Sequence, residues 1–350
     1  MIDLRSDFLA RRTPAMLEAA ARAEGSFHFG LREDPHQIEL ERRLAKILAQ
    51  DDALVFPTCT MANTTAVMLL APRGTRVATH GEAHIMMSEA GAASALAGVA
   101  LIPLAGDPAL PELSSWQQAT GSPHDPQRPP TSLFVLENTH NRSGGTPLPI
   151  SYVQEVLAIA RSHAVRAHLD GSRIFNAATA LGVPVSELCK GFDTVAVSLN
   201  KGYGAPIGAA LAGSKELIDA ALAVRQRLGG GIRPTGPAAA ATLAALDDAA
   251  PFANAHALAA SLARGLASID GLRIDSAKVR TNIVVVDIEP EGLSSVALGD
   301  RLAAQGLLVL PFGDKRLRFI TYRGVSESDI DETVSIVRSV MTSADLRSQP

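Results

Sequence analysis

Short apolar runs alternate with helical patterns along most of the chain. Apolar runs that predict strands stand at 53–56, 75–79, 132–137, 165–170 and 192–198. Apolar residues at helical spacing predict helices from Pro14, with Thr13 placed as the N-cap, and over 36–48, 61–70, 84–96, 152–163 and 214–228. Strands that alternate with helices of about 10–15 residues imply right-handed crossovers. We therefore expect an α/β fold with a mainly parallel sheet flanked by helices.

The pattern changes toward the C-terminus. A long alanine-rich helical stretch covers 237–269. It is followed by predicted strands and a last helix, at 281–288, 306–311, 316–322 and 326–341. We expect residues 1–245 to form an N-terminal arm and a large α/β domain, and residues 246–350 a smaller C-terminal α+β domain. The Pro-rich, polar segment between Asp107 and Thr131 predicts the longest loop.

Composition excludes several classes of protein. The chain has 350 residues, of which 47% are hydrophobic, and a net charge of −4, which argues against disorder and against nucleic acid as a partner. No apolar run approaches the roughly 18 residues of a membrane span, and charges near the N-terminus argue against a signal peptide. The two cysteines make no disulfide framework and fit no zinc spacing. We expect a cytoplasmic protein with a small-molecule substrate, no membrane partner and no metal.

An acid and a lysine follow two predicted neighbouring strands. Asp170 ends the strand at 165–170, and Lys201 follows the strand at 192–198, so both reach the edge where ligands of open α/β sheets bind. Alone, an aspartate before glycine usually forms a turn, and a lysine before glycine is usually a loop charge. Together they match pyridoxal phosphate chemistry, in which lysine forms a Schiff base and a carboxylate holds the pyridine nitrogen protonated.

Several motifs in the chain resemble a known family. They are HLDGSRIFNAA at 168–178, SLNKGYGAPIGA at 198–209, ENTHNRSGG at 137–145, LGGGIRPTG at 228–236 and the opening MIDLRSD. In these segments the sequence is similar to the low-specificity L-threonine aldolases, of the β-eliminating lyase group of fold type I pyridoxal phosphate enzymes. The resemblance runs from residue 1 to about residue 325 and implies the fold type I pyridoxal phosphate-dependent transferase-like architecture.

The resemblance implies a catalytic group and a cofactor site. Lys201 would be the Schiff-base lysine, Asp170 the partner of the pyridine nitrogen, and His84 the residue that stacks on the cofactor ring near the substrate hydroxyl. The cofactor phosphate would lie at a helix N-terminus, where backbone N–H groups favour an anion, against Thr58, Cys59 and Thr60. Thr60 is the better candidate for a side-chain contact there, since Cys59 replaces a glycine of the family.

Three further residues follow from the same resemblance as the substrate carboxylate site, namely Ser6, Arg173 and Arg318. Two arginines suit a bidentate carboxylate clamp, although Arg316 shares a strand face with Arg318. Arg233 matches an arginine that reaches the phosphate of a neighbouring subunit. This implies shared active sites and a homo-oligomer, which we expect to be a homotetramer built as a dimer of dimers.

Glu137, Asn138 and His140 are weaker candidates near the cofactor. They belong to the ENTHN motif at the end of the strand at 132–137, and His140 alternatively only orders the turn. Some members of the family carry a second active-site histidine about ten residues before ENTH, and the nearest histidine here is His124.

The chain departs from the family pattern where the substrate side chain is expected. Phe8 replaces a threonine, Ser88 replaces a frequent tyrosine, and the segment at 24–34 lacks another tyrosine. The lost tyrosines predict a pocket open to larger β-hydroxy amino acids, with L-phenylserine preferred over L-threonine.

The residues together predict a pyridoxal phosphate-dependent lyase. We expect retro-aldol cleavage of β-hydroxy-α-amino acids such as L-threonine, L-allo-threonine or phenylserine to glycine and an aldehyde. The alternatives are a related pyridoxal phosphate enzyme, namely a β-eliminating lyase, an amino-acid racemase or an aminotransferase, and a protein that binds the cofactor without turnover. A nicotinamide dehydrogenase is set aside, because KGYGAPIG at 201–208 lacks the G-x-G-x-x-G spacing.

Overall fold

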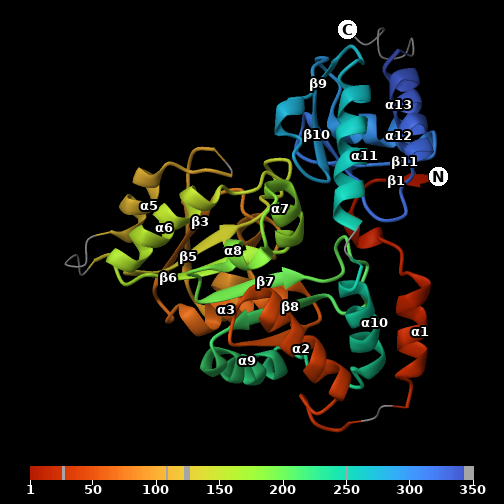
Figure 1. The fold of residues 1–350 in the computed structure, drawn as a ribbon. Coiled ribbons are helices and arrows are strands. Elements are labelled where there is room, and N and C mark those ends of the chain that lie inside the picture. The colour runs from red at the N-terminus through yellow and green to blue at the C-terminus, as the bar shows by residue number, and fades with distance from the viewer. Residues whose placement is uncertain (26–27, 108, 122–126, 249–250, 343–350) are drawn as a thin grey trace.

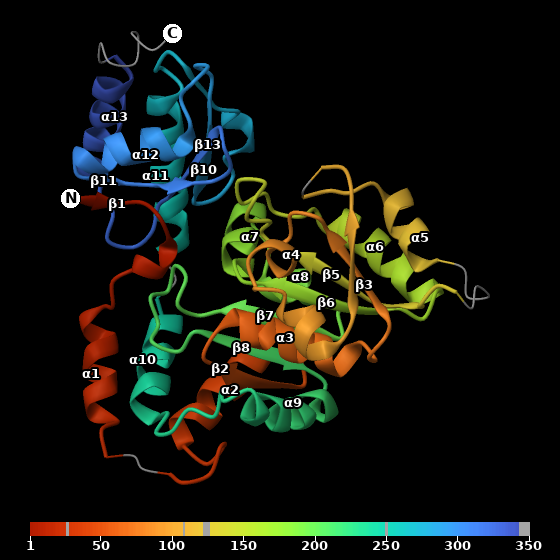
Figure 2. The ribbon, with the colours of Figure 1, turned by 180° about the vertical axis from the view of Figure 1, so that it is seen from behind.

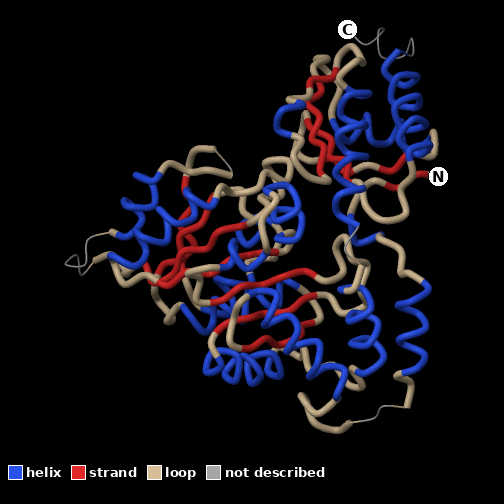
Figure 3. Tube along the Cα trace, viewed as in Figure 1, coloured by secondary structure: helices blue, strands red, loops and turns tan. Residues whose placement is uncertain are grey.

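A seven-stranded sheet and a four-stranded sheet organise the chain in the computed structural model. The structure describes residues 1–25, 28–107, 109–121, 127–248 and 251–342. Figure 1 shows the larger sheet in the lower part of the molecule and the smaller one above it, near the C-terminus. In Figure 3 helices cover both faces of the larger sheet.

The larger sheet has the strand order β2-β8-β7-β6-β5-β3-β4. The strands from β7 to β4 pair in parallel, and β8 runs antiparallel to both of its neighbours, β7 and β2. The mainly parallel sheet is therefore confirmed. The strands are β2 (Asp52–Phe56), β3 (Arg76–His80), β4 (Ala100–Leu104), β5 (Thr131–Glu137), β6 (Arg166–Gly171), β7 (Thr194–Ser198) and β8 (Ala209–Gly213).

Alternation of side chains along the strands divides the core of this domain into layers. On β2, Val55 packs with Leu40 and Leu44 of one helix layer, whereas Leu54 and Phe56 pack on the opposite layer. The helices of the domain are α1 (Pro14–Arg22), α2 (Pro35–Leu48), α3 (Cys59–Leu70), α4 (His84–Met87), α5 (Leu113–Thr120), α6 (Ile150–Ser162), α7 (Ile174–Leu181), α8 (Val185–Cys189), α9 (Lys215–Arg227) and α10 (Gly236–Leu246). Helices α1 and α10 lie side by side (Figures 1 and 2).

The smaller sheet is antiparallel, with the order β12-β13-β10-β9. Its elements are α11 (Pro251–Leu266), β9 (Leu272–Arg273), β10 (Ile283–Ile288), α12 (Ser295–Ala304), β11 (Leu307–Leu308), β12 (Leu310–Pro311), β13 (Arg316–Ile320) and α13 (Glu327–Thr342). The N-terminal strand β1 (Ile2–Asp3) pairs in parallel with β11, and Ile2 and Leu4 belong to the core of this part (Figure 2). We propose the domain boundary at residue 245, close to the end of α10.

Two predicted helices are wrong as continuous elements. The stretch at 84–96 divides into α4 and a π-helix over Ala93–Ala97, because Ala90 and Gly91 adopt left-handed backbone with φ of 51° and 69°. The long helix over 237–269 is two helices, of which α10 ends at Leu246 and α11 begins at Pro251. The proline at the start of α11 suits a helix N-terminus and not a helix interior.

Other differences concern short elements. The segment between Asp107 and Thr131 contains helix α5, whose Trp116 is buried, so the loop prediction is wrong for that part. The strand expected at 306–311 divides between β11 and β12, which belong to different sheets. Strands β4 and β8 were not predicted from the pattern.

Candidate active site

The parallel strands β5, β6 and β7 bring several polar side chains to one edge of the larger sheet. Glu137 at the end of β5 lies opposite Asp170 in β6, and Asp170 lies opposite Ala196 in β7. Lys201 follows β7 after a short turn. A β-carbon on Gly171 would lie 2.7 Å from the Ala196 carbonyl oxygen, so glycine permits the close approach of β6 and β7 at this edge.

Asp170 is buried, and its carboxylate is hydrogen-bonded on both oxygens. Asn63 Nδ2 donates to Oδ2 over 2.9 Å, and Ser172 Oγ donates to Oδ1 over 2.7 Å. Burial raises the pKa of Asp170, but His84, the Ser172 hydrogen bond and Lys201 outweigh burial and lower it. Asp170 is therefore an ionised carboxylate, which is the state that can hold a protonated ring nitrogen.

Lys201 is buried at the same edge, in contact with the N-terminal arm. Its Nζ lies 5.1 Å from the centre of the Phe8 ring. The following turn requires glycine, because Gly202 and Gly204 have φ of 74° and 71° and a β-carbon on Gly204 would lie 2.8 Å from the Ala10 carbonyl oxygen. The turn and the arm together place an amine and an aromatic ring side by side.

The N-terminus of α3 also points to an anion site. Thr58 is its N-cap and accepts a hydrogen bond from the Met61 backbone over 3.1 Å, which leaves its O–H able to donate. Cys59 and Thr60 occupy the first helical turn, where backbone N–H groups have no partner inside the helix. Burial raises the pKa of the Cys59 thiol, which keeps that side chain neutral.

His84 begins α4 and is tied to two carboxylates. Its backbone N–H donates to Glu137 Oε2 over 2.7 Å, and its Nδ1 lies 2.8 Å from Glu89 Oε1. Burial lowers the pKa of His84, but the Glu89 hydrogen bond and the charges of Asp170 and Glu137 outweigh burial and raise it.

Sequence reasoning missed the buried network that joins these residues. Asn63 Nδ2 donates to Glu89 Oε1 over 2.8 Å as well as to Asp170, and Asn63 Oδ1 lies 3.1 Å from His168 Nε2. Burial lowers the pKa of His168 to about 4, so its ring is neutral. The available signal was the presence of polar side chains in apolar surroundings, such as Asn63 inside the apolar helix α3.

Arg173 forms a buried ion pair with Asp7. Its Nε and Nη2 each donate to an Asp7 carboxylate oxygen over 2.8 Å. Asp7 belongs to the short turn that Ser6 caps by accepting a hydrogen bond from the Phe8 backbone over 3.3 Å. The charge of Arg173 is therefore already balanced, and Ser6 lies one residue away from this pair.

Arg318 differs from Arg173 in its partners. Its Nη1 donates to Asn141 Oδ1 over 2.8 Å, its Nη2 donates to the Arg5 carbonyl over 3.1 Å, and its Nε donates to no described residue. Among the residues that the structure describes, no carboxylate forms an ion pair with Arg318. Asn141 Oδ1 also accepts a 3.4 Å hydrogen bond from Arg173, so Asn141 brings the two predicted arginines together, and Arg316 is not part of this group.

Arg233 lies away from this cluster within one chain. It is exposed, its Nη1 donates to the Phe29 carbonyl over 3.2 Å, and its guanidinium lies 5.5 Å from the centre of the Phe29 ring. Within the described part of the chain its hydrogen bond and its ring contact are both with Phe29, and neither is with Lys201 or Asp170.

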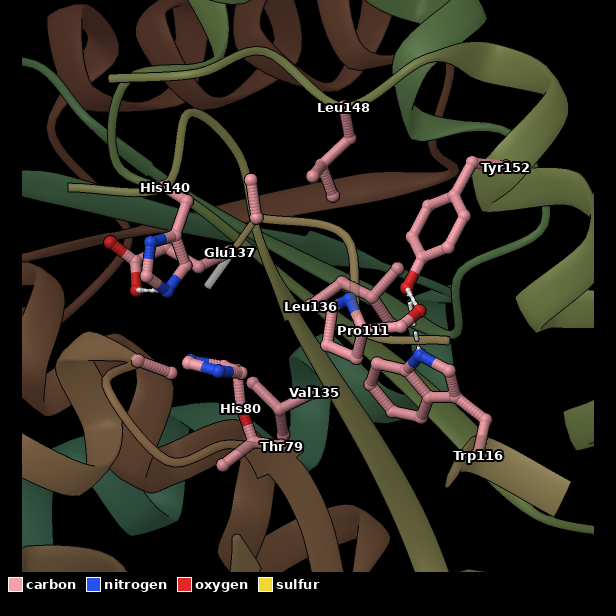
Figure 4. Close-up of a pocket in the computed structure, with 12 residues that line it drawn as sticks. Thr79, His80, Pro111, Trp116, Val135, Leu136, Glu137, His140, Leu148 and Tyr152 are labelled. Carbon is pink, nitrogen blue, oxygen red and sulfur yellow. Dashed lines mark hydrogen bonds and ion pairs between the residues drawn. The ribbon is translucent and has the colours of Figure 1, made fainter. Parts of the chain in front are cut away.

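The ENTHN motif lines a small cavity beside the site (Figure 4). The rings of His140 and His80 meet edge to face, 5.5 Å apart, and Glu137 lies next to His140. His140 Nδ1 accepts from the Ser143 backbone over 3.3 Å and Asn138 Oδ1 accepts from the Leu148 backbone over 3.1 Å, so both side chains order the turn. His124 lies outside the described residues.

Comparisons with known proteins agree with this arrangement. A family model described as β-eliminating lyase matches residues 3–289. The low-specificity L-threonine aldolase 1 of Arabidopsis thaliana is 37% identical over 345 residues, which cover 97% of this chain and 96% of that protein. The low specificity L-threonine aldolase of Escherichia coli strain K12 is 33% identical over 97% of this chain and 99% of its own. The solved threonine aldolase of Leishmania major superposes with a TM-score of 0.81 at 17% identity, over 98% of this chain and all of that chain.

Among the described residues, no helix is long and apolar enough to cross a membrane.

Proposed function

Because the chain belongs to the β-eliminating lyase family, we propose that it is an aldehyde-lyase that cleaves β-hydroxy-α-amino acids to glycine and an aldehyde with pyridoxal 5'-phosphate. The observation that carries the proposal is the pairing of the buried amine of Lys201 with the buried, ionised Asp170 at the ends of neighbouring strands. L-Threonine, L-allo-threonine and L-phenylserine are the substrates that we propose.

The residues present fit this cofactor. Asp170 would hold the pyridine nitrogen, Lys201 would bind the aldehyde carbon, and the N–H groups of Cys59 and Thr60 would face the phosphate. Gly208 has no room for a β-carbon, which would overlap the Pro57 carbonyl, so this end of β8 packs directly against the segment that leads into α3. When bound, pyridoxal phosphate supplies an electron sink for the bond that breaks at the α-carbon of the substrate.

Arg318, Arg173 and His84 would orient the substrate. Arg318, which is not paired with a carboxylate, would hold the substrate carboxylate, with Ser6 beside it. Arg173 would contribute mainly by fixing Asp7 and the N-terminal arm, since its charge is already balanced. His84 would accept the proton of the β-hydroxyl group, because its Nδ1 is held by Glu89 while its Nε2 makes no hydrogen bond to the described residues.

We propose that the protein is cytoplasmic and forms a homotetramer, a dimer of dimers with shared active sites. The exposure of Arg233 and of Phe29, which is 87% exposed, supports a contact there with a second copy. The test is to mix Lys201→Ala and Arg233→Ala variants after dissociation, since hybrid dimers would then regain one site with both residues. Failure to regain activity would show that each site is complete in one chain.

The reaction is tested by its products. Purified protein loaded with pyridoxal phosphate should release glycine and the matching aldehyde from the three amino acids above, and Lys201→Ala should release neither. Pyruvate with ammonia, or an inverted α-centre, without aldehyde would instead identify a β-eliminating lyase or a racemase.

A further inference from the structure

We propose that Glu89 is the positioning residue of His84, and that it makes Nε2 of His84 the atom that receives the hydroxyl proton of the substrate. The role toward the substrate rests on the proposed function, whereas the pairing of the two side chains rests on the structure alone.

The backbone after α4 brings Glu89 back to His84. Helix α4 ends at Met87, and Ala90 and Gly91 then take left-handed conformations, which are uncommon for alanine. Because the helix ends before Glu89, with Ser88 outside the helical conformation, the Glu89 side chain lies inward, where it is 3% exposed and 2.8 Å from His84 Nδ1. A continuous helix would put residues 84 and 89 on different faces, since positions three and four apart share a face.

A second contact fixes the Glu89 carboxylate. Asn63 Nδ2 donates to the same oxygen, Oε1, and Oε2 accepts no hydrogen bond from the described residues. Burial of a carboxylate is unfavourable unless a positive or hydrogen-bonding group faces it. His84 is the group facing Glu89 that can carry a positive charge, whereas the other titratable neighbour, Asp170, is an anion.

The hydrogen bond selects the tautomer of His84. A carboxylate only accepts, so Nδ1 carries the proton and Nε2 carries the lone pair. When the β-hydroxyl O–H bond breaks, the proton forms an N–H bond at Nε2, and the electron pair stays on oxygen to form the carbonyl of the aldehyde as the Cα–Cβ bond breaks. The electron pair of the broken Cα–Cβ bond stays on the α-carbon, which takes up one proton, so that glycine and the aldehyde together contain all the atoms of the substrate. Glu89 stabilises the imidazolium as the aspartate of a Ser-His-Asp triad does.

Other charged groups around the pair also favour the protonated form of His84. Asp170 and Glu137 act on His84 from β6 and β5 and favour its protonated form, while the charge of Lys201 acts on Asp170. The nearby Cys59 and His168 are neutral. Burial and the charge of Asp170 raise the pKa of Glu89, and the hydrogen bonds from His84 and Asn63 oppose this rise.

The first test is nitrogen NMR of the histidine rings in the protein without cofactor, with His84 assigned from a His84→Ala variant. Wild type should show Nδ1–H as the neutral tautomer of His84. In Glu89→Gln, which keeps an acceptor but loses the charge, the pKa of His84 should fall by about one unit or more. Glu155→Gln, a change of the same kind on the exposed face of α6, should leave it unchanged.

The second test is the pH profile of kcat/KM for L-phenylserine. His84 must be unprotonated to accept a proton, so activity falls as pH drops through its pKa, and Glu89→Gln should move that limb to lower pH while the plateau falls roughly tenfold or more. An unchanged limb and an unchanged pKa of His84 would overturn the proposal. An Nε2–H tautomer in wild type would also overturn it, even if Glu89→Gln does not fold. Absence of aldehyde from wild type would reject the proposed function and leave the NMR test of the pair decisive.

Discussion

Arg173 and Asp7 are joined by two hydrogen bonds of 2.8 Å although they lie 166 residues apart in the chain. Both side chains are buried, and Asn282 also donates to Asp7 over 3.3 Å. The pair ties the N-terminal arm to the turn after β6, and Asn282 adds the small domain. One ion pair therefore holds together the parts of the chain that carry Ser6, Phe8 and Arg318.

Loss of this pair should destabilise the fold in a pH-dependent way. Burial raises the pKa of Asp7, but Arg173 and Lys201 outweigh burial and lower it to about 2, against about 3.9 in the unfolded chain. The stabilisation is therefore present above pH ~4 and lost as pH falls toward ~2. We expect Asp7→Asn to lower the free energy of unfolding by about 3 kcal/mol at neutral pH.

Denaturant unfolding of wild type and Asp7→Asn between acidic and neutral pH measures this difference. The gap in the free energy of unfolding should shrink by on the order of 2 kcal/mol as pH falls through that window. Asp300→Asn, at an exposed position of α12, is the control. A gap that does not change with pH would show that Asp7 is not an ionised partner of Arg173.

Arg318 should determine the affinity for the substrate carboxylate. Among the described residues its Nε has no hydrogen-bond partner, its other hydrogen bonds go to neutral oxygens, and its guanidinium lies 4.8 Å from the centre of the Phe312 ring. A charge-assisted hydrogen bond contributes about 1.5–3 kcal/mol, so Arg318→Lys should raise KM for L-threonine roughly 10- to 100-fold with little change in cofactor affinity. Steady-state kinetics of Arg318→Lys beside Arg316→Lys checks this. If the two variants changed KM equally, the substrate carboxylate would not bind at Arg318.

Asp170 should be needed for turnover and not for retention of the cofactor. Asp170→Asn keeps the shape of the side chain but removes the charge that the ring nitrogen needs. Activity should fall at least roughly a hundredfold, while absorbance of the purified protein still shows bound cofactor. Ser172→Ala removes one hydrogen bond to Asp170 and leaves its charge, so its loss should be much smaller. Near-normal activity of Asp170→Asn would contradict the assigned role.

Phe8 should favour substrates with an aromatic β-substituent. Its ring is 57% exposed and lies 5.1 Å from Lys201 Nζ, close to where the substrate must bind. An aromatic pair contributes about 0.5–1.5 kcal/mol, so Phe8→Thr should lower the preference for L-phenylserine over L-threonine by roughly three- to tenfold. Val296→Thr is a control at a distant, equally exposed apolar residue. An unchanged ratio of the two kcat/KM values would remove Phe8 from the substrate pocket.

The strand pattern was sufficient to predict which side chains meet at the edge of the larger sheet. Asp170 and Lys201 follow strands whose apolar runs are unambiguous, and parallel neighbours end at the same edge. The family motifs extended this to Arg318 and His84, whose local segments match over several residues. Asp7 was not predicted as the partner of Arg173, because no spacing rule connects side chains so far apart in the chain.

Glu89 escaped prediction for a different reason. The apolar periodicity of 84–96 indicates one amphipathic helix, and in that helix Glu89 would be a solvated polar residue. Helix α4 instead ends at Met87, Ser88 leaves the helical conformation, and the Glu89 side chain lies inward against His84. The apolar periodicity of this segment therefore could not predict the contact between Glu89 and His84.

The most direct measurement is a time course of product release from L-phenylserine by the cofactor-loaded protein, with Lys201→Ala in parallel. Benzaldehyde and glycine should appear in equal amounts with wild type, and neither should appear with Lys201→Ala. Amino acid consumed without aldehyde, or aldehyde released equally by Lys201→Ala, would contradict the assignment of this site to retro-aldol cleavage.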